Sequence, residues 1–61
     1  MWWLLYNKDT LTIHNRFYLE KDAQKKLRKI ERNQPMKDWG IDYLDPGVTE
    51  KQWRMWKQLQ R

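Results

Sequence analysis

The stretch WWLLYNKDTLTIHNRFYL, residues 2–19, decides the fold, because it holds two strand-like segments around a short polar gap. Residues 2–6 are all aromatic or aliphatic, as is common in strands. Asn7-Lys8-Asp9-Thr10 is a polar gap of four residues that suits a hairpin loop, although it lacks the glycine of the tightest turns. The following residues alternate between apolar and mostly polar side chains. The apolar set is Leu11, Ile13, Phe17 and Leu19, with Asn15 as the exception, and the other set is Thr12, His14, Arg16 and Tyr18. We therefore predict an antiparallel hairpin over residues 2–19.

The first strand of this hairpin is apolar on both faces. Trp2, Leu4 and Tyr6 share one parity, Trp3 and Leu5 share the other, and successive side chains of a strand point to opposite faces. A strand buried on one face only would leave half of these side chains in water. We therefore expect the second face to meet another segment of this chain, a second copy or a partner.

Residues 20–33 have the periodicity of an amphipathic helix. Leu19, Ala23, Leu27 and Ile30 form one apolar stripe, and Asn33 and Pro35 mark the end of the helix. At 100° per residue, five basic side chains fall together on the opposite side: Lys21, Lys25, Arg28, Lys29 and Arg32.

Residues 34–48 are predicted to be irregular, and they contain both prolines and both glycines. Within them, Ile41 and Tyr43 suggest a short third strand. A helix over residues 49–60 follows, with a capping box between Thr49 and Gln52 and a hydrophobic staple between Val48 and Trp53. Its apolar face is about 160° wide and comprises Trp53, Met55, Trp56 and Leu59. Its other side is basic, with Lys51, Arg54, Lys57 and Arg61.

These segments predict one small α+β domain over residues 1–61, in the order ββα(β)α. The N-terminal antiparallel hairpin is expected to pack with two amphipathic helices. The first helix covers one face of the hairpin in a two-layer arrangement, and the last helix lies beside it or across the other face.

Composition limits the class of protein. The chain has 61 residues, a net charge of +5 and no cysteine, so disulfides are excluded and a reducing compartment is compatible. The apolar run at the N-terminus is too short for a signal sequence or a membrane span. We expect a soluble, cytoplasmic protein with no role at a membrane.

The usual catalytic side chains are scarce. There is no serine or cysteine, His14 is the only histidine, and the two glycines form no phosphate-binding loop. Asp38, Asp42 and Asp45 are the only carboxylate cluster, and their spacing matches no metal-binding motif. We therefore expect no enzyme activity, cofactor, metal or small-molecule substrate.

The leading hypothesis is a protein-interaction module, a small regulator or inhibitor that docks through its aromatic hairpin. The expected interface residues are Trp2, Trp3, Leu5, Tyr6 and Tyr18. The partner is a larger protein, such as nucleic-acid-handling machinery, or a second copy in a homodimer. By association, the small size and the reading frame suggest a phage or mobile-element accessory protein.

The alternative is a sequence-tolerant nucleic-acid-binding protein, because a basic helix face can lie along a phosphate backbone. Its binding residues would be Arg16, Lys21, Lys25, Arg28, Lys29 and Arg32, with His14 and Tyr18 available for stacking. A third and more distant hypothesis is a subunit of a metal-dependent nuclease, which would lose its activity on Asp42→Ala.

Overall fold

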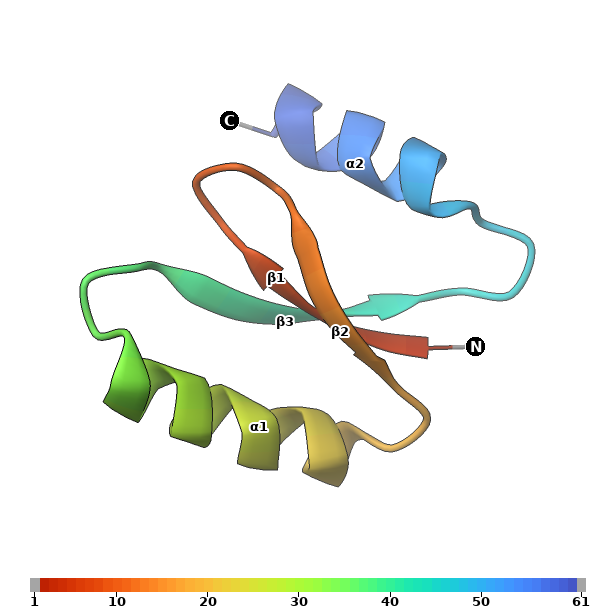
Figure 1. Ribbon diagram of the computed structural model, residues 1–61. Coiled ribbons are helices and arrows are strands. Elements are labelled where there is room, and N and C mark those ends of the chain that lie inside the picture. Colours follow the sequence, from red (N-terminus) through yellow and green to blue (C-terminus); the bar gives the residue numbers. More distant parts are fainter. Residues whose placement is uncertain (1, 61) are drawn as a thin grey trace.

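The computed structural model describes residues 2–60. Arg61, which the sequence places on the basic side of the last helix, lies outside the described residues. The elements follow in the order β1 (Trp2–Asn7), β2 (Ile13–Phe17), α1 (Glu20–Asn33), β3 (Trp39–Leu44) and α2 (Glu50–Leu59). The predicted α+β class and the hairpin packed with two helices are confirmed (Figure 1).

The three strands form one antiparallel sheet in the order β2-β1-β3. The suggested third strand is therefore real, and its register pairs Leu5 of β1 with Ile41 and Trp3 with Tyr43. Because β3 pairs with β1 on the side away from β2, the first strand of the chain becomes the central strand of the sheet.

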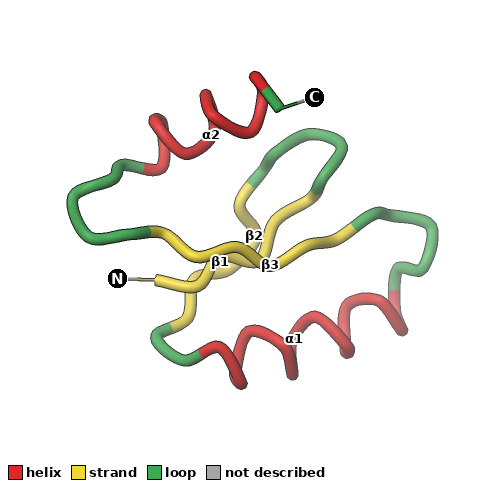
Figure 2. The backbone as a smooth tube through the Cα atoms, turned by 180° about the vertical axis from the view of Figure 1, so that it is seen from behind, coloured by secondary structure: helices red, strands yellow, loops and turns green. Residues whose placement is uncertain are grey.

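The central position of β1 explains why it is apolar on both faces. Leu4 packs in a cluster with Trp53 of α2, Leu5 packs in a separate cluster with Ile30 of α1, and both leucines are 0% exposed. The helices lie on opposite sides of the sheet (Figures 1 and 2). Of the two positions predicted for the last helix, the structure has the one across the other face, so α2 adds a third layer to the hairpin and first helix.

A bulge in the hairpin changes which side chains share a face. The β1–β2 register shifts between Leu5 and Tyr6, so that Ile13 lies opposite Tyr6 while Phe17 lies opposite Trp3. Ile13 accordingly packs on the α2 side and Phe17 on the α1 side. The prediction that these two residues share one face was wrong, because a bulge inserts one residue and reverses the alternation beyond it.

The loop before β2 has its own hydrogen bonds. The Asn7 side-chain Oδ1 accepts the Asp9 N–H at 2.8 Å, and the Leu11 N–H donates to the Asn7 carbonyl at 2.7 Å. Leu11 has a positive φ of 61°, which is unusual for a leucine, and its side chain is buried in the α2-side cluster. The turn is therefore closed by side-chain and backbone contacts in place of a glycine.

The start of α2 matches its predicted caps. The Thr49 hydroxyl accepts the Gln52 N–H at 3.1 Å, and the Gln52 side chain accepts the Thr49 N–H at 3.0 Å. Val48 packs against the cluster that contains Trp53, as a hydrophobic staple does. Among the described residues, neither helix has the length and apolar character that crossing a membrane would require.

Candidate functional site

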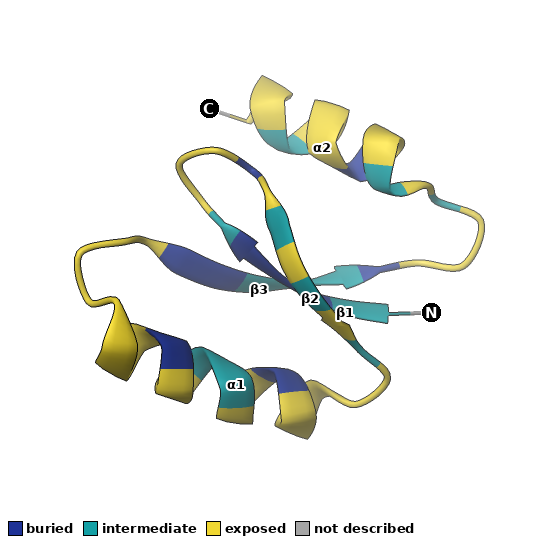
Figure 3. Ribbon diagram, in the orientation of Figure 1, coloured by how far each residue is buried: buried dark blue, intermediate teal, exposed yellow. Residues whose placement is uncertain are grey.

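The basic face of α1, defined as Lys21, Lys25, Arg28, Lys29 and Arg32, is exposed along its whole length. The opposite side of the helix buries Ala23 and Ile30 toward the sheet (Figure 3). Lys21 and Arg32 are separated by about 17 Å along the helix axis. Within residues 2–60, none of the five cations has an ion pair, and Asp22 is the acidic residue that borders them. The structure thus brings together five of the six residues of the nucleic-acid alternative.

Arg16, the sixth residue, is on the other side of the sheet. It lies opposite Leu4 in the register and forms a bidentate ion pair with Glu50 at the start of α2, with Nη2 to Oε1 at 2.6 Å. The hydrogen bond from Arg16 lowers the pKa of Glu50, and the same bond raises the pKa of Arg16. Arg16 therefore connects β2 to α2 and is separated from the basic face by the sheet.

The aromatic hairpin does not form one continuous surface. Leu5 and Tyr6 are core residues, with exposures of 0% and 6%, and the Trp2 and Trp3 side chains are half-buried. Tyr18 is 74% exposed, and its ring stacks on Trp2 with centroids 4.3 Å apart. The Trp3 ring lies on the α1 side, 5.0 Å from that of Tyr43. Of the five expected interface residues, only Trp2 and Tyr18 share an accessible surface.

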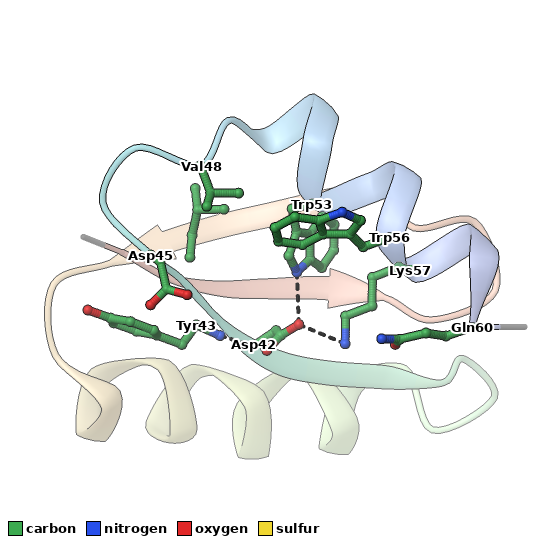
Figure 4. A pocket seen from close by; sticks show the side chains of 9 residues that line it. Asp42, Tyr43, Asp45, Val48, Trp53, Trp56, Lys57 and Gln60 are labelled. Carbon is green, nitrogen blue, oxygen red and sulfur yellow. Dashed lines mark hydrogen bonds and ion pairs between the residues drawn. The ribbon is translucent and has the colours of Figure 1, made fainter.

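Asp42 is the best-connected polar side chain in the described part of the molecule. Its Oδ2 accepts the Trp53 indole N–H at 2.8 Å and pairs with Lys57 Nζ at 2.7 Å, while its Oδ1 accepts the Tyr43 N–H at 2.8 Å (Figure 4). Burial acts to raise the pKa of Asp42, but the hydrogen bonds from these three donors outweigh it and hold that pKa below its ordinary value. Asp42 therefore connects the middle of β3 to two successive turns of α2.

The contacts of Asp42 extend into an aromatic cluster that sequence analysis did not identify. The Tyr6 ring meets Trp53 edge to face at 4.9 Å, and Lys57 Nζ lies 5.7 Å from the centre of the same Tyr6 ring. A cleft of about 280 Å³ opens beside this cluster, with Trp56 and Asp45 among the residues that line it. These side chains fix the position of α2 on the sheet.

The remaining candidates for chemistry do not converge. Among residues 2–60, no three His, Asp or Glu side chains lie close enough to hold a metal ion. His14 is exposed, its Nδ1 lies 2.7 Å from Asn15 Oδ1, and its ring packs edge-on against Trp39.

The outward side of α2 was not among the expected interface residues. Only Trp53 of its four apolar side chains is buried, while Trp56, Met55 and Leu59 are 54%, 54% and 82% exposed. The signal was present in the sequence, because an apolar face about 160° wide is broader than the stripe that a helix needs for one contact with a sheet.

By fold, this chain is an α+β domain with one helix on each face of a three-stranded antiparallel sheet. Comparison with protein-family models, with curated proteins and with solved structures found no match. Two of its helix faces, the basic face of α1 and the outward side of α2, are exposed to solvent.

Proposed function

We propose that this protein is a non-catalytic, sequence-tolerant nucleic-acid-binding module of the cytoplasm, in which the basic face of α1 lies along a phosphate backbone. One observation carries the proposal: five exposed cations share one side of a 14-residue helix and have no ion pair within the described residues. The net charge of +5 adds a general attraction to polyanions.

The spacing of these cations has an energetic cost in the free protein. Lys21 and Lys25, Lys25 and Lys29, and Arg28 and Arg32 are each four residues apart, so each pair lies on neighbouring turns. Like charges at this spacing destabilise a helix by about 0.2–0.5 kcal/mol per pair. Phosphates bound along this face would replace that repulsion with attraction.

The same face indicates the type of contact. It carries no aromatic side chain, and Tyr18 and Arg16 are on the α2 side of the sheet, so stacking on bases is not available along α1. Phosphate contacts position a protein on nucleic acid without selecting a sequence. Affinity should therefore depend on salt and on the number of phosphates, with little dependence on base order.

Docking through the hairpin stays a prediction with less support, because Leu4, Leu5 and Tyr6 of β1 are buried. The protein is proposed to be non-catalytic because the chain has no serine or cysteine and its best-connected carboxylate, Asp42, is engaged with α2.

The test is a fluorescence-anisotropy titration of labelled DNA duplexes and single strands of two unrelated sequences. If all five cations contact phosphates, the slope of log K against log salt for duplex DNA should be about −4.5. This slope corresponds to a loss of about 500-fold in affinity between roughly 50 mM and 200 mM salt.

Charge-reversal variants distinguish binding through the basic face of α1 from a general attraction by the net charge. Lys25→Glu with Arg28→Glu lowers the net charge from +5 to +1, two changes of −2 each, and should reduce the slope by about 2. Lys51→Glu with Arg54→Glu makes the same change of charge on α2 and serves as the matched control. The proposal is wrong if wild type does not bind at low salt, or if both double variants weaken binding equally.

A further inference from the structure

A cavity of about 310 Å³ lies between the hairpin loop and the start of β3, in the lower part of the size range of ligand pockets. Six residues line it: Asn7, Thr10, Thr12, His14, Lys37 and Trp39. Within the described residues, no carboxylate is part of this lining, and none of the six belongs to the basic face of α1 or to the contacts of Asp42. The cavity is therefore separate from the features described above.

The lining is rich in hydrogen-bond donors that have no acceptor. The Asn7 Oδ1 accepts the N–H groups of Asp9 and Thr10, so its Nδ2 donors are left for a different acceptor. The Thr10 hydroxyl donates to Thr12 Oγ1 at 2.9 Å, and the Thr12 hydroxyl keeps its own hydrogen for another partner. Lys37 is exposed and has no ion pair within residues 2–60. A ligand with several acceptor atoms would complement these groups.

The fourth donor is the indole N–H of Trp39. Trp39 is only 8% exposed, and its Nε1 is buried without a hydrogen-bond partner in the described part of the chain. Buried polar groups in proteins nearly always have a partner, so an unpaired indole N–H calls for a missing acceptor. Leu5 and Ile30, which pack with Trp39 in the core, have no side-chain acceptor. The cavity is where an acceptor from outside the chain can be supplied.

The His14 side chain lies against this indole and is free to move. The two rings meet edge-on, with centroids 5.3 Å apart. His14 is the extra residue of the bulge, because Ile13 and Asn15 have register partners on β1 and His14 has none. Its side chain is exposed, and the only hydrogen bond it makes among the described residues is to the neighbouring Asn15. The ring can therefore turn aside for a ligand without breaking a contact between strands.

The position of the cavity in the domain indicates phosphate as the acceptor. The loop that carries Lys37 follows directly after the C-terminal end of α1, and this loop and the hairpin loop lie at the same end of the domain (Figures 1 and 2). A strand along the basic face of α1 would have one of its ends near this loop. A phosphate monoester carries a charge of about −1.5 to −2 near neutral pH and three acceptor oxygens. It therefore suits one cation and several neutral donors better than a carboxylate does.

We propose that this cavity binds a phosphate monoester, which is either the terminal phosphate of a nucleic-acid strand or the phosphate of a free nucleotide. Lys37 would supply the charge, and Asn7, Thr12 and Trp39 would donate hydrogen bonds to the phosphate oxygens. Binding of a strand end rests on the proposed function of α1, whereas binding of a free nucleotide does not.

The test is a titration of ¹⁵N-labelled protein with AMP, followed by NMR at constant ionic strength, with adenosine as the ligand control. The Trp39 indole N–H and the amides of Thr12 and His14 should shift with AMP and stay in place with adenosine. Lys37→Gln should weaken AMP binding by about fivefold, as expected for loss of one exposed charge contact. Lys51→Gln removes the same charge from α2 and should bind AMP as wild type does. Both lysines are exposed, so both variants should keep the melting temperature of wild type.

Oligonucleotides with a 5′-phosphate, a 3′-phosphate or neither distinguish the two sources. If strand ends bind, one of the phosphorylated forms should bind about fivefold more tightly than the unphosphorylated form, and Lys37→Gln should remove the difference. If AMP binds at the cavity while all three oligonucleotides bind equally, the ligand is a free nucleotide.

The variant Lys25→Glu with Arg28→Glu keeps this test independent of the basic face of α1. It should bind AMP as wild type does, whatever its affinity for DNA, so a failure of the proposed function leaves the cavity testable. The proposal would be overturned by a Trp39 indole resonance that neither AMP nor a phosphorylated oligonucleotide moves, by equal shifts with adenosine, or by equal weakening in Lys37→Gln and Lys51→Gln.

Discussion

Removal of the Asp42 carboxylate should release α2 from the sheet. In the variant Asp42→Ala, the buried Trp53 indole loses its acceptor, Lys57 loses its counter-ion and the Tyr43 N–H loses its local partner. Two of these losses, at Trp53 and Lys57, are on α2, the helix that covers the second face of β1 in the described structure. We therefore expect a lower stability for the whole domain together with a change in the environment of Trp53.

The magnitude follows from the individual contacts. A buried N–H left without an acceptor costs about 1–3 kcal/mol. The pair between Asp42 and Lys57 has side-chain exposures of 31% and 26%, so solvent screening limits it to about 1 kcal/mol. Together they give about 2–4 kcal/mol, which lowers the melting temperature by roughly 10–30 °C for a domain of this size. The stability of Asp42→Asn should fall between those of wild type and Asp42→Ala, because an amide oxygen can still accept the indole N–H.

The assay is urea and thermal unfolding followed by far-UV and near-UV circular dichroism. Asp45→Ala is the matched control, since it removes a nearby exposed aspartate that lines the same cleft. The pKa of Asp42 is lower in the folded protein, so its contribution is present above the unfolded value of about 3.9 and disappears as pH falls through the folded pKa. The difference between wild type and Asp42→Ala should therefore shrink below about pH 4. Equal stability of Asp42→Ala and Asp45→Ala at neutral pH would refute this role.

Three further predictions concern the local contacts that shape the domain. Gly40→Ala should destabilise the fold by about 1–3 kcal/mol in urea unfolding, because its Cβ would come within 3.2 Å of the Tyr6 ring; an unchanged midpoint would show that the ring can move. Thr49→Ala should cost about 1 kcal/mol by removing the cap of α2, and far-UV circular dichroism should show the helix fraying; an equal loss in Thr49→Ser would contradict this reason. Glu50→Gln should reduce the loss of stability on acidification, because the ion pair with Arg16 lowers the pKa of Glu50; an unchanged acid unfolding curve would contradict it.

Much of the fold could be predicted because its signals are short in range. The polar gap at residues 7–10, the periodicity of residues 20–33 and the box between Thr49 and Gln52 each depend on residues a few positions apart. Ile41 and Tyr43, two positions apart, likewise predicted β3 from a local pattern. The face of Ile13 was predicted incorrectly, because the bulge between Ile13 and Asn15 has no distinctive residue to reveal it.

The candidate site was less accessible to prediction. The five cations of α1 share a face through helix geometry alone, so they were found together, whereas Arg16 was grouped with them although the sheet separates it from α1. Asp42 was considered with Asp38 and Asp45, since sequence spacing was the only guide. Its actual partners, Trp53 and Lys57, meet it only after α2 has folded across the sheet.

Backbone preference and side-chain periodicity were therefore enough to define two strands, two helices and the N-terminal cap of α2, since these depend on contacts within a turn or a hairpin. The position of α2 was decided by long-range packing. From the sequence, the second apolar face of β1 could be covered equally well by a helix of this chain, a second copy or a partner. The same packing determined that Trp53 is buried while Trp56 and Leu59 remain outside, since a sheet covers only part of a broad apolar helix face.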